Sequence, residues 1–131
     1  MDDLDLDLDL DLDLLLSVWV NFRKLNVYQF AVRFLPMAHE IAASLPKPHA
    51  GLADQLRRAS LSIPLNIAEG SGKTSAADQR RFYAIARGSA MECGAIVDAC
   101  IALNFITKNQ GDQANELLLP VVKMLSKMCV N

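Results

Sequence analysis

The sequence has few of the residues that favour β-strands. Aromatic residues make up 6% of its 131 positions, there is a single tryptophan, and runs of β-branched residues are short. Strands are enriched in aromatic and β-branched residues, whereas alanine and leucine, which are abundant here, favour helices. The length suits one domain with one core. The composition therefore predicts an all-α domain.

Cysteine and histidine are too sparse to suggest a metal site or a disulfide framework. The three cysteines are Cys93, Cys100 and Cys129. Cys93 and Cys100 are about 10.5 Å apart along a predicted helix, whereas a disulfide requires Cα atoms within about 7 Å. His39 and His49 have no orienting partner nearby in the sequence. We therefore expect reduced thiols in a cytoplasmic protein, with no metal, no cofactor and no catalytic residue.

A glycine is missing from the one segment that resembles a phosphate-binding loop. Residues 70–74, GSGKT, match the end of the motif G-x-x-x-x-G-K-[ST], but Ile67 occupies the position of the first glycine. Without that glycine no nest of backbone amides forms around phosphate oxygens. The preceding residues also show helical spacing, not the pattern of a buried strand. We therefore expect a corner between two helices, and a protein that is not an enzyme.

Basic residues are absent from the first twenty positions. The net charge of −2 combines 13 basic with 15 acidic residues, and seven of the acidic ones lie in residues 1–20. Residues 21–131 therefore hold 13 basic and 8 acidic residues. We divide the chain into an acidic Asp-Leu extension, residues 1–20, and a domain, residues 21–131. The extension is expected to be a mobile tail, or to fold back on the domain or pair with a partner. Its apolar run, LLLSVWV, is too short to span a membrane.

Four later segments have apolar residues at three- and four-residue steps, which predicts four helices. They cover about residues 23–44, 52–69, 75–105 and 112–129. Ser75 and Asp78 have the spacing of a helix N-cap. The segment TKNQGD is expected to break the chain before the last helix. Short loops between long amphipathic helices predict an antiparallel up-down four-helix bundle.

The rows expected to face the core follow from this spacing. In the first helix the row is Leu25, Tyr28, Val32, Leu35 and His39. In the second it is Leu52, Leu56, Ala59, Ile63 and Ile67. The third helix carries a long row from Phe82 and Ile85 through Cys93 and Cys100 to Phe105. Gly88 and Gly94 lie inside this helix although glycine has a low helix propensity. Their small size suggests that another helix approaches there.

The second helix also has apolar residues on another side. These residues, Leu61, Leu65 and Ala68, predict an oligomer interface. Basic residues gather in the same part of the sequence, and they form the candidate nucleic-acid-binding set: Arg57, Arg58, Lys73, Arg80, Arg81 and Arg87. A solvated basic face without a ligand is the alternative. Asn66 is expected to repair the hydrogen bonding around Pro64, and Glu69 to pair with Arg81 or Lys73.

Two stretches resemble the four-helix bundle proteins known as 23S ribosomal RNA intervening-sequence proteins. They are NFRKLNVYQFA and LADQLRRASLSIPLNIAEGSGKTSAADQRRFYAIARGSAMEC. Within the second, the specific run is SIPLNIAEG, with the signature residues Ser62, Pro64, Asn66, Glu69 and Gly70. The resemblance begins at about residue 21. Leu65 stands where many relatives have a small polar residue.

The resemblance implies a four-helix protomer of a closed ring of five, and it does not imply an enzyme. Relatives that serve as accessory variability determinants of diversity-generating retroelements imply binding to nucleic acid and to a reverse transcriptase. Three hypotheses follow. The protein is a homo-oligomeric scaffold for RNA, DNA or a nucleic-acid enzyme; or a protein scaffold with no nucleic-acid role; or, least favoured by the residues, a nucleotide-using enzyme.

Overall fold

The protein folds into five α-helices in this computed structural model, which describes residues 3–130 and the side chains of residues 12–17, 19 and 21–130. Over these residues no strand forms, which confirms the all-α prediction. The helices are α1 Asp3–Lys24, α2 Asn26–Ser44, α3 Ala50–Ser71, α4 Ala76–Ala102 and α5 Lys108–Met128, with a short 3₁₀ turn at Lys47–His49.

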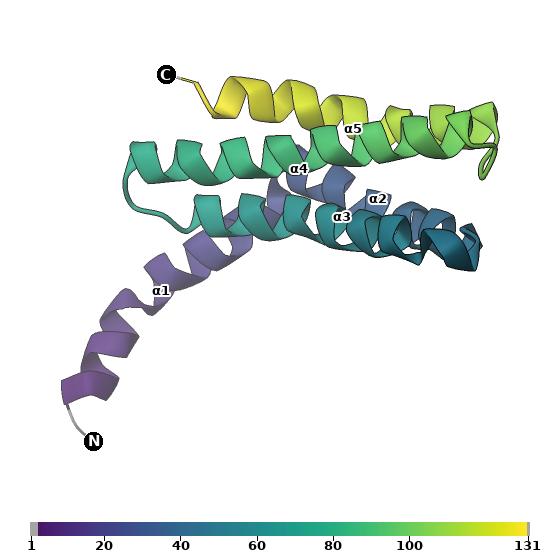
Figure 1. Ribbon diagram of the computed structural model, residues 1–131. Coiled ribbons are helices and arrows are strands. Elements are labelled where there is room, and N and C mark those ends of the chain that lie inside the picture. The colour runs from purple at the N-terminus through teal and green to yellow at the C-terminus, as the bar shows by residue number, and fades with distance from the viewer. Residues whose placement is uncertain (1–2, 131) are drawn as a thin grey trace.

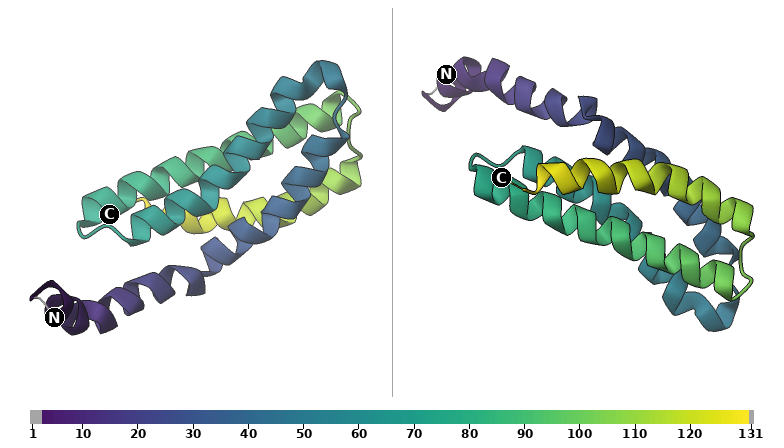
Figure 2. Two further views of the ribbon diagram at one scale, coloured as in Figure 1. Left: turned by 90° about the horizontal axis from the view of Figure 1, so that it is seen from below. Right: turned by 90° about the horizontal axis from the view of Figure 1, so that it is seen from above.

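Helices α2 to α5 form an antiparallel bundle (Figure 1). Consecutive helices pack against each other, and α5 closes the arrangement by packing against α2. The α3–α4 turn and the C-terminus lie at one end of the bundle, and the α2–α3 and α4–α5 connections lie at the other. This confirms the predicted up-down four-helix bundle. Helix α1 touches only α2 and α3 and diverges from the bundle (Figure 2).

The core confirms the predicted rows of α3 and most of α4. Leu56, Ile63 and Ile67 of α3 are fully buried, and so are Cys93 and Cys100 of α4. One residue of the predicted α4 row was assigned wrongly, because the Ile85 side chain is 43% exposed. A helix buries only one side within a four-helix bundle, and that residue lies on the edge of the buried side.

The predicted core row of α2 was wrong. The buried residues of this helix are Val27, Ala31, Phe34, Ala38, Ile41 and Ala42. His39 and Val32 of the predicted row are exposed, and its other members are only partly buried. Both rows are largely apolar, so spacing alone does not choose between them. The buried row alternates alanine with larger residues, and the alanines allow closer approach by α3 and α5.

The ends of the helices show one confirmed cap and one wrong boundary. Ser75 accepts a hydrogen bond from the Asp78 amide at 3.1 Å, as predicted. Helix α5, however, begins at Lys108 and not at residue 112. Thr107 and Gln110 form a reciprocal capping box there. The break falls earlier, where Asn104 has φ of 62°, a left-handed conformation that asparagine tolerates better than most residues.

Residues 3–24 form a helix that contacts α2 and α3, whereas the sequence predicted a mobile tail, or one that folds back on the domain or pairs with a partner. Leucine favours helix strongly, and the helix ends where Leu25 adopts an extended backbone. Its last turns are held by aromatic contacts. Phe22 packs edge-on against Tyr28 of α2 with ring centroids 5.0 Å apart, and the Arg23 guanidinium lies over the Trp19 ring. The expectations for residues 1–2 lie outside the described residues.

Candidate functional site

The signature residues join α3 to α4 through a short polar network. The Asn66 side-chain amide donates to the Ser62 carbonyl at 2.8 Å and to the Ser62 hydroxyl at 2.9 Å. That hydroxyl also bonds the Ser89 hydroxyl of α4 at 2.8 Å. Asn66 was expected to repair the hydrogen bonding beside Pro64. Its amide bonds the Ser62 carbonyl and not the Ser60 carbonyl, which Pro64 leaves without a helical donor, and the link to α4 is made by Ser62.

Gly70 has a packing role that sequence reasoning missed. Gly70 lies inside α3, which continues to Ser71, and it is buried. A Cβ atom added at Gly70 would lie 2.8 Å from Cε1 of Tyr83. The Tyr83 hydroxyl in turn bonds the Ser71 hydroxyl at 3.1 Å. The tyrosine therefore occupies the space that a side chain at position 70 would need.

The GSGKT segment is a helix corner, as predicted. It contains the last two residues of α3, Gly70 and Ser71, and Gly72 caps the helix. Two predicted basic residues meet beside this corner on the ring of Phe82. The Lys73 ammonium lies 4.9 Å from the ring centroid and the Arg81 guanidinium 4.7 Å from it. We call Lys73, Arg81 and Phe82 the basic corner.

The other predicted basic residues point elsewhere. Arg57 pairs with Asp54 on the same helix at 3.3 Å, and it lies about 21 Å along α3 from the end of the helix at Ser71. The Arg87 Nε donates to the Ser126 hydroxyl of α5 at 2.8 Å. Arg80 is half-buried and Arg58 is exposed. The six residues therefore do not form one cluster, because the helical twist and the packing of α5 separate them.

A family model described as 23S rRNA-intervening sequence protein matches residues 23–127. The chain belongs to this family. The match covers the four-helix bundle from the start of α2 to the last turn of α5, and it leaves out nearly all of α1. No curated protein matches the chain.

Within the family region, one apolar side of α3 is left open. The Leu61 and Leu65 side chains are 42% and 64% exposed, whereas Ile63 and Ile67 on the opposite side are fully buried. Ala68, the third residue of the predicted interface, is partly buried. Helix α3 is thus apolar on two sides, and the bundle covers one of them.

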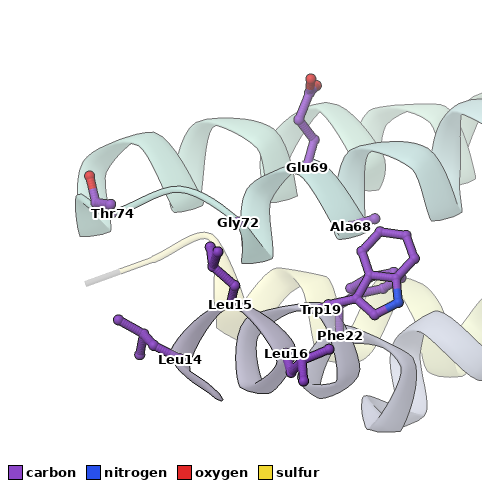
Figure 3. A pocket seen from close by; sticks show the side chains of 9 residues that line it. All are labelled: Leu14, Leu15, Leu16, Trp19, Phe22, Ala68, Glu69, Gly72 and Thr74. Atoms are coloured by element: carbon purple, nitrogen blue, oxygen red, sulfur yellow. The ribbon is translucent and has the colours of Figure 1, made fainter. Parts of the chain in front are cut away.

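Outside the family region, α1 adds an apolar cleft at the end of α3 (Figure 3). Its volume is about 770 Å³, and it is lined by Leu14, Leu15, Leu16, Trp19 and Phe22 of α1 with Ala68, Glu69, Gly72 and Thr74 opposite. Glu69 makes no ion pair with Arg81 or Lys73, so that prediction was wrong; Arg81 instead lies 3.9 Å from Asp78. The sequence did not reveal the cleft because α1 was expected to be a tail.

A second apolar surface lies between α4 and α5. This groove has a volume of about 540 Å³ and is lined mainly by Ala90, Met91, Gly94, Ala95, Leu119 and Val122, with Asp98 and Asn115 toward one end. An added Cβ at Gly88 or Gly94 would meet nothing within 4 Å. The helix expected to approach these glycines is therefore not one of this chain's described helices, and the surface stays open.

The thiols and histidines are placed in settings without an evident catalytic arrangement. Burial, with a smaller effect of Glu92, raises the pKa of the Cys93 thiol to about 12, and burial also raises the pKa of Cys100. His49 packs on Phe105 with ring centroids 4.6 Å apart, and His39 is exposed. Among the described residues, no three potential ligands gather as a metal site would require. In the same part of the chain, none of the helices is long and apolar enough to cross a bilayer.

Proposed function

We propose that the protein is a non-enzymatic, homo-oligomeric scaffold of helical bundles. The observation that carries this proposal is the open apolar side of α3, where Leu61 and Leu65 are exposed beside a fully packed core. Contiguous exposed apolar surface on a small domain marks an interaction site. The family resemblance favours a closed ring of five. The buried, protonated thiols suit a reducing cytoplasm.

Mass measured by light scattering tests the scaffold. We expect an oligomer for the wild type and a monomer for Leu61→Glu, because a charge buried without a partner opposes association. Leu103→Glu is the matched control, since Leu103 is 50% exposed and follows the end of α4, away from this surface. A wild type that stays monomeric at high micromolar concentration would defeat the proposal.

A second role, binding of nucleic-acid phosphates, is favoured by the basic corner. The charged groups of Lys73 and Arg81 both lie over the Phe82 ring. Residues 21–131 carry 13 basic against 8 acidic residues. Each phosphate contact contributes a slope of about −0.9 to log affinity against log salt for duplex DNA. Loss of two contacts should flatten the slope by about 1.8 per engaged protomer. The partner would be RNA, DNA or an enzyme that acts on nucleic acid.

Fluorescence anisotropy with RNA and DNA at two salt concentrations tests this role. We expect Lys73→Glu/Arg81→Glu to weaken binding at low salt. Lys47→Glu/Lys108→Glu makes the same change in charge at the opposite end of the bundle, and it should weaken binding less. If the two variants lose equal affinity for nucleic acid, the loss reflects only the change in net charge, and the basic corner is not the binding site. No binding at low salt would favour a scaffold for proteins alone.

A further inference from the structure

Two surface rows on different helices have matching length and the same order of charge along the chain, basic first and acidic last. The first, which we call the α3 row, is Arg58, Leu61, Leu65 and Glu69. The second, the α4 row, is Arg87, Met91, Gly94 and Asp98, along the groove between α4 and α5. Each row spans twelve residues at three- and four-residue steps, so its first and last residues are about 16.5 Å apart along one side of the helix.

The charged ends of the two rows complement each other in an antiparallel alignment. Arg58 then lies opposite Asp98, and Glu69 lies opposite Arg87. All four side chains are exposed. Within the described side chains, the ion pairs present are Arg57 with Asp54 and Arg81 with Asp78, so the four are available. The bond to Ser126 uses only Nε of Arg87, which leaves the other guanidinium donors for a carboxylate.

The apolar parts between the charges also fit. The α3 row projects two leucines, whereas the groove beside the α4 row is lined by the small residues Gly94 and Ala95 and by the larger Met91 and Leu119. Apart from its chain neighbours and the backbone of its own helix, none of the described residues has an atom within 4 Å of a Cβ built at Gly94. Small residues let two helices approach closely, and projecting side chains of one helix fill the grooves of another.

We propose that the α3 row of one copy docks antiparallel into the α4–α5 groove of the next copy. This rests on the proposed homo-oligomer and adds which surfaces meet, in which direction and in which register. The two surfaces are distinct and do not overlap, since α3 does not contact α5. Each copy can therefore use both at once. Such head-to-tail contacts generate rings when the rotation closes.

The direction of the helices supports this arrangement. Within the bundle α3 and α4 are antiparallel neighbours (Figure 1). In a copy related by rotation about an axis roughly along the bundle, α4 keeps its direction, so it remains antiparallel to the first copy's α3. The α1 helix lines one cleft together with Ala68 and Gly72 and leaves Leu61 and Leu65 exposed.

The docking assigns Arg58 and Arg87 to contact between copies. Both belong to the predicted nucleic-acid-binding set, in which Lys73 and Arg81 then keep the role of binding phosphates. The two assignments separate experimentally, because charge reversal at Arg58 should change the mass of the assembly, whereas reversal at Lys73 should not.

Cysteine cross-linking tests the register. In this alignment position 65 faces position 91 of the next copy, so Leu65→Cys/Met91→Cys should form a ladder of covalent multimers on non-reducing gels, in a Cys129→Ser background. Leu65→Cys/Ala84→Cys is the control, since Ala84 is exposed and lies two turns from Met91 on nearly the same side of α4. Each single cysteine should give no cross-linking, and a reductant should collapse the ladder.

Charge exchange tests the pairing. Arg58→Glu and Asp98→Arg should each raise the dissociation constant of the assembly about tenfold, because like charges then face each other. The double variant should return it to within about threefold of the wild type. An oligomeric wild type without the ladder, or strong dimers from Leu65→Cys alone, would overturn the docking while the homo-oligomer stands. A monomeric wild type would instead defeat the homo-oligomer itself.

Discussion

Replacement of Gly70 by alanine should destabilise the fold, although alanine is the better helix former. The new Cβ would lie 2.8 Å from Cε1 and 3.0 Å from Cδ1 of Tyr83, and 3.1 Å from Cβ of Phe82. Tyr83 is held by its hydrogen bond to Ser71, and Phe82 meets the new atom through its own Cβ, so neither neighbour moves without shifting α4. Overpacking of this kind costs about 1–3 kcal/mol. The gain in helix propensity offsets about 1 kcal/mol of it.

Gly88→Ala is the matched control. Position 88 lies in the interior of α4 with nothing within 4 Å of an added Cβ, so this variant should gain up to about 1 kcal/mol. Gly111→Ala should fall between the two, because its Cβ first meets the Cδ1 end of Ile101, a side chain that can turn away. The three substitutions share their chemistry and differ in the neighbours of the new methyl group.

Urea unfolding followed by circular dichroism at 222 nm measures the effect. All variants need the same protein concentration, because oligomerisation contributes to apparent stability. We expect the midpoint to fall for Gly70→Ala and to rise for Gly88→Ala. If Gly70→Ala gains as much stability as Gly88→Ala, the close contact with Tyr83 does not constrain position 70 and the explanation of this signature residue is wrong.

Three further predictions concern the thiols and the first helix. Ellman's reagent at pH 8 should modify Cys129 in the folded protein, but Cys93 and Cys100 only on unfolding, because both are fully buried. The raised pKa of Cys93, about 12 against an ordinary 9.0, means that the unfolded chain loses this proton first. Ionisation of the Cys93 thiol should therefore leave the free energy of unfolding unchanged below pH 9 and lower it as pH rises from 9 toward 12. A chain that begins at Asn21 should still unfold cooperatively, as measured by thermal circular dichroism, since the described core begins at Val27; loss of the transition would make α1 part of the fold.

The sequence predicted the buried side of a helix where one apolar row is longer than the other. In α3 the longer row, through Leu56, Ile63 and Ile67, is the one that the bundle buries. In α2 two neighbouring rows are apolar, and packing against α3 and α5 decides between them. The start of α5 was misplaced because Gly111 suggested a break. It is in fact buried against Ile101 and Val97, and the capping box at Thr107 starts the helix.

The candidate surfaces were harder to predict because they depend on helices that are distant in sequence. Lys73 and Arg81 meet on Phe82 across a four-residue loop, so the corner could be anticipated from local sequence. The partner of Arg87 is Ser126, 39 positions away, and no local pattern indicates it. The groove beside Met91 likewise exists only because Leu119 of α5 lies alongside. Spacing locates a side chain on its own helix, but its neighbours depend on the packing.

The two proposed roles are linked by where the basic corner lies. The α3–α4 turn is at one end of the bundle (Figure 1), about 12 Å along α3 beyond Leu65. Copies related by rotation about an axis roughly along the bundle would present their corners on the same face of the ring. Several weak sites on one face bind a continuous polyanion far more tightly than one site does, provided that the spacing allows simultaneous contact. Leu61→Glu should therefore weaken nucleic-acid binding and flatten its salt dependence although Lys73 and Arg81 are intact. If the dissociated variant binds as tightly as the assembly, each corner acts alone and the ring has another purpose.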